Sequence, residues 1–280
     1  MTGWRRNTAW PETGEKDGAW MSEPCLNPTP PAVRAWRFVR LAWHLVVMCV
    51  GSAVIFPWVD ATRRRALKRQ WSGQILAILG VQVELADSLP AVSGLILANH
   101  ISWLDIVAIN TVRPAAFIAK SEVRRWPLIG WLSARNETVF LRRGSHGHAR
   151  VVNAEIDALL TAGVDVAVFP EGTTTDGTHL LGFHAALLQP AVETERPILP
   201  ITISYHDATG RHTSAPSFVG EITLIQCLLR ILACRTLSVR LNPGVPIDTT
   251  GRTRRELAAQ AHTVIATAIS SALVAPPAGN

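Results

Sequence analysis

The sequence predicts an α/β fold, with a mixed, largely parallel sheet flanked by helices and an N-terminal membrane-associated helix. Three observations predict it. Short apolar runs alternate with stretches of helical periodicity from about residue 60 onward, as strands joined by crossover helices do. Before them, residues 41–59 form 19 positions without Asp, Glu, Lys or Arg. Of the 280 residues, 48% are hydrophobic and 17% are charged, against about 25% charged in soluble domains, which favours a lipid surface.

The N-terminal quarter of the chain contains the segment that we expect to contact a membrane. Residues 1–33 are polar and proline-rich without a period, which predicts a disordered extension and not a signal peptide. Residues 34–69 form a membrane-associated helical segment with basic flanks, and its apolar centre is just long enough to span a hydrocarbon core of about 30 Å. The denser basic flank lies downstream, so a spanning helix would leave the body of the protein on the cytoplasmic side of the inner membrane.

Three residues within the apolar stretch weaken a spanning helix. These are His44, Gly51 and Pro57. A helix lying in the plane of the membrane surface is compatible with all three. Spanning helix, in-plane helix and buried core helix all stay open on the sequence.

Residues 70–275 carry the alternating pattern and are expected to form one domain. A helix is predicted over 61–79, across the start of this domain, from apolar residues at helical spacing. Strands are predicted at 81–85, 94–98, 115–119, 138–141, 164–169, 198–204 and 237–241. Further helices are predicted at 149–162, 182–192 and 252–273, the last with an N-cap at Thr249 or Thr250.

Net charge and cysteine spacing limit the partners. The formal charge is +6, which suits anionic headgroups, phosphorylated substrates or nucleic acid. Ten Trp against one Tyr favour lipid, and no nucleic-acid-binding module accompanies the charge, so we expect no nucleic-acid partner. The four cysteines (Cys25, Cys49, Cys227 and Cys234) lie far apart without zinc-ligand spacing. We therefore expect reduced thiols in a cytosol-facing protein and no metal site.

His100 is the first candidate catalytic residue. It follows Asn99 directly after the apolar run 94–98, and active sites of open α/β sheets gather at the carboxyl ends of strands. Asp105 can reach its ring if His100 lies in the turn and Asp105 in the first turn of a helix, with Ser102 as the cap. The carboxylate would then orient the imidazole as a base. The alternative interpretation is purely structural: a capping histidine followed by an aspartate at the N-terminus of a helix, with no catalytic role.

The chain offers this base no obvious protein nucleophile. The sequence has no Gly-x-Ser-x-Gly elbow, and no cysteine follows a predicted strand in a comparable position. A base without a protein nucleophile indicates that a hydroxyl of the substrate is the nucleophile. The reaction would then be a direct transfer to the substrate. A serine hydrolase that uses Ser102 is an alternative, although it lacks the elbow.

A basic segment is the second candidate site. The predicted strand 138–141 ends at Arg142 and Arg143, and arginine binds phosphate through two parallel hydrogen bonds. From residue 113 to residue 150 the sequence contains eight Lys and Arg residues and only two Glu. An anionic headgroup could bind here, and the alternative is a solvated or lipid-facing basic surface.

Two further segments end predicted strands. In the run that follows Phe169, Pro170 ends the strand, Gly172 permits a tight turn, and exposed amides could hold an oxyanion or a phosphate. Glu171 could accept hydrogen bonds from a polyol or contact a cation. Pro200 lies inside the apolar run 198–204, where proline is tolerated at an edge, a strand start or a bulge. We therefore expect that strand to border a cleft.

With these four segments in this order, the chain resembles the 1-acyl-sn-glycerol-3-phosphate O-acyltransferase family, within the wider glycerolipid acyltransferases, over about residues 70–270. Asn-His-Ile-Ser-Trp-Leu-Asp resembles the His-x4-Asp block of the family. Phe-Leu-Arg-Arg, Phe-Pro-Glu-Gly-Thr and Leu-Pro-Ile resemble its other three blocks. Lys120 stands where the family usually has a lysine.

The resemblance implies an acyltransferase domain at 70–275, with His100 as the base and Asp105 as its partner. The substrate-binding residues that it implies are Lys120, Phe140, Arg142, Arg143, Glu171, Gly172, Thr173 and Pro200. The implied donor is acyl-CoA or acyl carrier protein as co-substrate, without a further cofactor. The implied acceptor is a lysolipid in the membrane, with 1-acyl-sn-glycerol-3-phosphate and its product phosphatidic acid as the first expectation.

Two departures of this sequence from the family pattern leave other functions open. Phe183-His184 stands where many family members have Phe-Lys, and the tract 173–177 resembles a bacterial branch that includes lyso-ornithine lipid O-acyltransferases. Lyso-ornithine lipid is therefore an alternative acceptor. A non-catalytic protein that binds anionic lipid through its basic surface and the 41–59 helix is an alternative of another class, against which the presence of His100, Asp105 and Glu171 argues.

Overall fold

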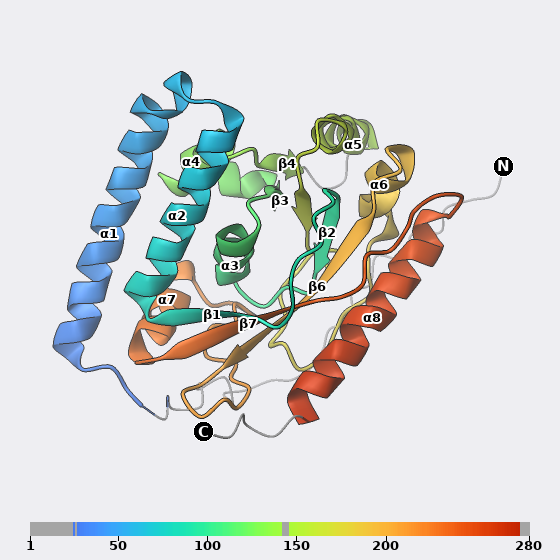
Figure 1. Cartoon of the computed structure of the whole chain (residues 1–280). Coiled ribbons are helices and arrows are strands. Elements are labelled where there is room, and N and C mark those ends of the chain that lie inside the picture. The colour runs from blue at the N-terminus through green and yellow to red at the C-terminus, as the bar shows by residue number, and fades with distance from the viewer. Residues whose placement is uncertain (1–24, 26, 142–145, 275–280) are drawn as a thin grey trace.

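A seven-stranded mixed sheet forms the centre of the molecule (Figure 1). The computed structural model describes residues 25, 27–141 and 146–274. The strands are β1 (Val81–Leu85), β2 (Leu95–Ala98), β3 (Ala116–Lys120), β4 (Val139–Leu141), β5 (Val166–Val168), β6 (Ile198–His206) and β7 (Leu237–Pro243). Their order is β1-β7-β6-β2-β5-β3-β4. All neighbours pair in parallel except β6 and β7, so the predicted mixed, largely parallel sheet is confirmed.

Helices cover both faces of this sheet (Figure 1). The α-helices are α1 (Pro31–Val54), α2 (Ala61–Leu79), α3 (Leu104–Val112), α4 (Ile129–Arg135), α5 (His146–Thr161), α6 (Gln189–Glu193), α7 (Leu224–Ala233) and α8 (Arg254–Val274). The short 3-10 helices are η1 (Phe56–Trp58), η2 (Ser121–Arg125) and η3 (Ala185–Leu188). Buried side chains of α2, α3 and α7 form one core with the sheet, and those of α5, α6 and α8 form the other. Helix α1 packs outside α2 (Figure 1).

The central strand β2 shows how the two cores arise. All four of its residues are buried, and because side chains alternate across a strand, consecutive residues face opposite cores. Leu95 and Leu97 pack with α5 and α8, whereas Ile96 and Ala98 pack with α2 and α3. A strand buried on both faces reads as a continuous apolar run. That run carries the chain to Asn99 and His100 at the carboxyl edge of the sheet.

Every predicted strand is present within a few residues, and the helix boundaries differ more. The predicted helix 182–192 consists of a loop, η3 and the short α6. Helix α8 begins at Arg254, and its cap is Thr253 instead of the predicted Thr249 or Thr250. The Thr253 Oγ1 accepts the Glu256 N–H at 3.4 Å, and Glu256 Oε2 accepts the Thr253 N–H at 2.8 Å. This reciprocal pair satisfies two amides that an upstream threonine could not reach.

Of the placements that the sequence allowed for Pro200, the edge strand is excluded, and the expectation that strand 198–204 borders a cleft stays a prediction. Strand β6 lies between β7 and β2, inside the sheet. Ile198 and Pro200 present their backbone groups to the same side, where the Pro200 carbonyl accepts the Gly244 N–H at 2.8 Å, just past the end of β7. The missing N–H of Pro200 therefore interrupts no bond to β2, which is why an interior strand tolerates proline here.

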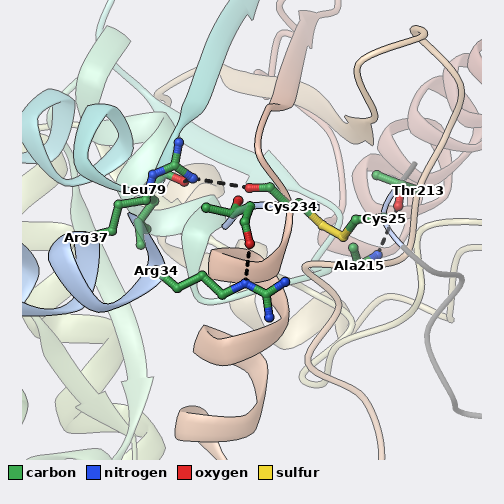
Figure 2. Close-up of a disulfide and its surroundings, with 8 residues drawn as sticks. Cys25, Arg34, Arg37, Leu79, Thr213, Ala215 and Cys234 are labelled. Atoms are coloured by element: carbon green, nitrogen blue, oxygen red, sulfur yellow. Dashed lines mark hydrogen bonds between the residues drawn. A yellow bond between two sulfur atoms is a disulfide. The ribbon is translucent and has the colours of Figure 1, made fainter. Parts of the chain in front are cut away.

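Helix α1 is attached to the body of the protein near both ends. At its N-terminal half, the Arg37 guanidinium donates to the carbonyls of Leu79 at 3.1 Å and Cys234 at 3.2 Å, and so satisfies the ends of α2 and α7 (Figure 2). At its C-terminal half, Gly51 lies against the Trp71 ring, where a Cβ atom would come within 2.8 Å. The whole length of α1 therefore follows α2.

A disulfide joins Cys25, ahead of α1, to Cys234 at the end of α7, with a Cα–Cα distance of 5.3 Å (Figure 2). The expectation of four reduced thiols is wrong for this pair. The two residues are 209 positions apart, so spacing alone gave no sign of the bond. Backbone hydrogen bonds from Thr29 to Ala233 and from Arg235 to Asn27 bring the two segments together. The other cysteines, Cys49 and Cys227, are free, as predicted.

The outer surface of α1 is apolar and exposed. Within the described residues, Pro31–Trp58 is the one stretch long and apolar enough to cross a membrane, and only 22% of its most apolar window is buried. Its exposed large apolar side chains are Val33, Trp36, Phe38, Val39, Trp43, Val46, Val47, Val50, Val54, Ile55 and Trp58. An exposed apolar surface of this kind marks an interaction site, which argues against a buried core helix.

Candidate active site

Asn99 fixes the position at which the chain leaves β2. Its side-chain amide donates to the Ile203 carbonyl at 2.9 Å, and its Oδ1 accepts the Ile203 N–H at 2.7 Å. Both bonds are buried, so the side chain continues the pairing of β2 with β6 one residue beyond the strand. His100 follows immediately and is therefore held at a defined place on the carboxyl edge of the sheet.

The predicted contact between His100 and Asp105 is present. His100 Nδ1 lies 2.8 Å from Asp105 Oδ2, with Asp105 in the first turn of α3. The same oxygen accepts the N–H groups of Ile101 at 2.7 Å and Ser102 at 2.9 Å. The expectation that Ser102 caps the helix is wrong, because the N-cap residue is Trp103 without a side-chain bond. The carboxylate of Asp105 satisfies the amides of the turn instead.

This arrangement defines the tautomer of His100. A carboxylate accepts only, so it selects the imidazole form with the proton on Nδ1 and leaves Nε2 with its lone pair. The Asp105 side chain is fully buried, and 19% of the His100 side chain is exposed. The Phe169 ring stacks on the imidazole, with ring centroids 3.9 Å apart and an interplanar angle of 9°. The ring is thus fixed in plane and still reachable from solvent.

Tyr205 is a further member of the site, which our sequence analysis missed. Its hydroxyl donates to Asp105 Oδ1 at 2.7 Å, and its side chain is fully buried. Burial, with the charge of Asp105 in addition, raises the pKa of Tyr205 well above 10, so the phenol stays protonated and donates. The two residues are 100 positions apart, and no local spacing relates them. Tyr205 is the single tyrosine of the chain, which was the only available signal.

Glu171 connects the His100 turn to the loop that follows β5. Its Oε1 accepts the His100 N–H and its Oε2 accepts the Leu181 N–H, both at 2.9 Å. The side chain is buried, and burial raises the pKa of the carboxyl group above its usual range. Next to it, Gly172 has a φ of +70°, which confirms the predicted tight turn. With both oxygens of Glu171 engaged by backbone, its assignment as a substrate ligand stays a prediction.

Two backbone hydrogen bonds complete the wall around His100. The Thr175 N–H donates to the His100 carbonyl at 2.8 Å, and the Phe218 N–H donates to the Ile101 carbonyl at 2.9 Å. The Thr174 hydroxyl also donates to the Phe218 carbonyl. The hydroxyl-rich tract after Gly172 and the segment before α7 therefore flank the turn that carries the base.

The other predicted substrate-binding residues lie at varying distances from this centre. Lys120 ends β3 and Thr173 is exposed beside Gly172, both at the same edge of the sheet as His100. Phe140 lies on the outermost strand β4, under the Arg124 guanidinium at 5.4 Å. Arg142 and Arg143 lie outside the described residues. All of these assignments stay predictions.

Pro200 lies on the face of the sheet that α8 covers, opposite the face covered by α2 and α3. Strand residues alternate, and its neighbour Leu199 belongs to the core with α2 and α3. A Cβ atom at Gly244 would lie 3.0 Å from Pro200 and 2.9 Å from Val264 of α8. The Pro200 side chain therefore packs towards α8. A substrate bound at His100 would have to extend past β2 to the opposite face of the sheet to contact it.

The site can perform base chemistry on a hydroxyl. An oriented imidazole with a free Nε2 removes a proton, and the buried carboxylate stabilises the imidazolium that forms. Within the part of the chain that the structure describes, no group of three or more His, Cys, Asp or Glu side chains could hold a metal ion. The described side chains thus provide a base and its orienting groups.

Comparisons with known proteins place these features in a family. A family model described as Acyltransferase matches residues 80–204. The chain is 37% identical over 214 residues to a lyso-ornithine lipid O-acyltransferase of Pseudomonas aeruginosa, covering 76% of this chain and 82% of that protein. It is 36% identical over 211 residues to a 1-acyl-sn-glycerol-3-phosphate acyltransferase of Neisseria meningitidis, covering 75% and 82%.

A solved structure has the same fold. The crystal structure of the 1-acyl-sn-glycerophosphate (LPA) acyltransferase from Thermotoga maritima superimposes with a TM-score of 0.62 at 23% sequence identity. The match covers 86% of this chain and 98% of that one. At this identity the likeness concerns the fold.

The double contact of Glu171 predicts that Glu171→Gln destabilises the loop after β5. An amide nitrogen cannot accept, so either the His100 or the Leu181 N–H loses its acceptor, at a cost of about 1–3 kcal/mol. Thermal unfolding should therefore occur at lower temperature, and hydrogen exchange should accelerate at residues 172–181. Glu155→Gln, at an exposed position of α5, is the matched control. Equal unfolding temperatures and exchange rates in the two variants would contradict this role.

Proposed function

Because this chain belongs to the 1-acyl-sn-glycerol-3-phosphate O-acyltransferase family, we propose that it moves a fatty acyl group to the free hydroxyl of 1-acyl-sn-glycerol-3-phosphate, giving phosphatidic acid. The donor is the thioester of acyl-CoA or acyl carrier protein. The observation that carries the proposal is the His100–Asp105 pair at the end of β2, with its 2.8 Å contact. A base poised for a hydroxyl is what direct O-acylation requires.

The proposed reaction is a direct transfer in a ternary complex. His100 Nε2 takes the proton of the acceptor hydroxyl while that oxygen attacks the thioester carbonyl. Backbone amides stabilise the oxyanion of the tetrahedral intermediate. The carbon–sulfur bond then breaks, the ester forms, and the thiolate takes the proton from His100. Asp105 holds the imidazole in its tautomer through both proton transfers.

Charge near the site supports a phosphate in the acceptor. Lys120, Arg124 and Arg125 lie at or just after the end of β3, the same edge of the sheet as His100. Cationic residues at these positions favour an anionic headgroup. The second candidate acceptor is lyso-ornithine lipid, favoured by the naming of the Pseudomonas aeruginosa relative.

We further propose that α1 lies in the plane of the membrane surface. A spanning helix would leave the protein body, whereas Arg37 and Gly51 hold both halves of α1 against it. Its exposed Trp36 and Trp43, at 61% and 68%, face away from the body, and indole rings favour the bilayer interface. The catalytic domain would then lie on the cytoplasmic face of the inner membrane, where acyl thioesters are available.

Replacing the base tests the proposed reaction. His100→Ala should lower acyl transfer by roughly a thousandfold, within the range of general-base contributions, without altering the unfolding temperature by more than a few degrees. His262→Ala on α8, whose ring contacts Phe183, is the histidine control and should retain activity within a few-fold. Turnover by His100→Ala close to that of the unmodified enzyme, measured as thiol release, would sink the proposal.

A panel of lysolipids tests the acceptor. We expect turnover on 1-acyl-sn-glycerol-3-phosphate to exceed turnover on lyso-ornithine lipid by about tenfold or more, because a paired phosphate is worth at least one charge-assisted hydrogen bond. Both acceptors are assayed with acyl-CoA and with acyl carrier protein. The reverse ranking with either donor would select the second candidate, and a deletion strain would then lose ornithine lipid instead of phosphatidic acid.

Cysteine labelling tests the membrane geometry. In a variant whose four native cysteines are serine, Asn27→Cys lies before α1 and Ala154→Cys lies in α5, both exposed. For an in-plane helix, a membrane-impermeant maleimide should label both positions from the same side of sealed membrane vesicles. Labelling of the two positions from opposite sides would show instead that α1 spans the bilayer.

A further inference from the structure

We infer that Tyr205 is a positioning residue of the reaction, and that its hydroxyl sets both the orientation of Asp105 and the basicity of His100. The inference deepens the proposed function and rests on it. It is drawn from the hydrogen bonds around one buried carboxylate, and Tyr205 lies outside the four segments whose sequences resemble the family.

The donors to Asp105 are divided unequally between its two oxygens. Oδ2 receives the His100 ring at 2.8 Å and the N–H groups of Ile101 and Ser102 at 2.7 and 2.9 Å. On Oδ1 the structure places the Tyr205 hydroxyl at 2.7 Å. Of these four donors, the tyrosine alone comes from outside the turn that carries the base. Tyr205 therefore fixes the second corner of the carboxylate from a different part of the fold.

The position of Tyr205 makes this anchor rigid. It lies near the end of β6, paired with Val239 of β7, and its side chain packs in the core with Ile101 and Leu104. Neither Tyr205 nor Asp105 is exposed at all, so water does not compete for Oδ1. The bond therefore connects the sheet directly to the first turn of α3.

The hydroxyl also has an electrostatic consequence for the base. A donor on Oδ1 withdraws negative charge from the carboxylate and so weakens its hold on the imidazolium. Without the hydroxyl, Asp105 would hold protonated His100 more firmly, and a higher pH would be needed to free the base. The other titratable groups that face this cluster, Glu171 beside His100 and Cys227 near Asp105 and Tyr205, are the same with and without the hydroxyl. A stronger donor would act in the opposite direction.

The first experiment removes the donor. Tyr205→Phe should lower kcat roughly tenfold or more, as expected for loss of a hydrogen bond to a buried charge, with KM changed by no more than about twofold. The acid limb of the kcat–pH profile should move to higher pH. Ser204→Ala on the same strand, which loses a 2.9 Å contact with His206 and leaves Asp105 untouched, should move neither.

The second experiment strengthens the donor without removing it. Since the chain has one tyrosine, biosynthetic incorporation of 3-fluorotyrosine labels position 205 alone. The ring fluorine makes the phenol a stronger donor, and burial keeps it protonated. The acid limb should then move to lower pH, opposite to Tyr205→Phe. This variant also tests the inference if the phenylalanine variant fails to fold.

The outcomes separate this inference from the proposed function. If the unmodified enzyme does not acylate lysolipids, the proposed function is wrong. The contact between Tyr205 and Asp105 can then still be tested, because the 19F resonance of fluorotyrosine should shift in Asp105→Asn and not in Ser204→Ala. If the enzyme is active, the positioning role is overturned when the acid limb of the kcat–pH profile does not move. It is also overturned when the limb moves in the same direction for both changes at Tyr205. An equal effect of Ser204→Ala would overturn it as well.

Discussion

The buried carboxylate of Asp105 is the interaction on which the site depends. It sits at the first turn of α3, and its partners come from the His100 turn and from β6. A buried carboxylate is expensive unless its oxygens are satisfied, so the fold must bring these donors together before the site exists. The same bonds that satisfy the charge also orient the imidazole. Stability of the turn and competence of the base are therefore coupled.

The second constraint is the attachment of α1 to the catalytic body, on which the proposed contact with a lipid surface depends. Arg37 and Gly51 hold α1 along α2, so that its exposed apolar side lies at a fixed orientation to the sheet. The disulfide between Cys25 and Cys234 adds to this attachment. Cytosolic thiols are usually kept reduced, so a cytoplasmic placement predicts that the hydrogen bonds of Thr29 and Arg37 suffice to hold the segment without it. Hydrogen bonds and a disulfide therefore both join the start of α1 to the end of α7.

Much of the fold and the centre of the site could be predicted from the sequence, because these depend on local patterns. Apolar runs located all seven strands, and the strand-end position of His100 with Asp105 five residues on predicted their contact. The predictions that failed depend on partners far away in the chain. The interior position of β6, the Cys25–Cys234 bond and the hydrogen bond from Tyr205 to Asp105 each involve residues that the topology brings together. Ser102 failed as a cap for a local reason, because the helix begins one residue later, with Trp103 as its N-cap. The carboxylate of Asp105 accepts the amides of Ile101 and Ser102 in the turn before it.

The central claim is that His100 activates the acceptor hydroxyl directly, without an acyl-enzyme. The most direct measurement incubates the enzyme with a labelled acyl thioester in the absence of acceptor, quenches it in denaturant and determines the label bound to protein. Direct transfer predicts no covalent label, and release of thiol only after lysolipid is added. Stoichiometric acylation of the chain, with rapid thiol release before any acceptor is present, would contradict the account.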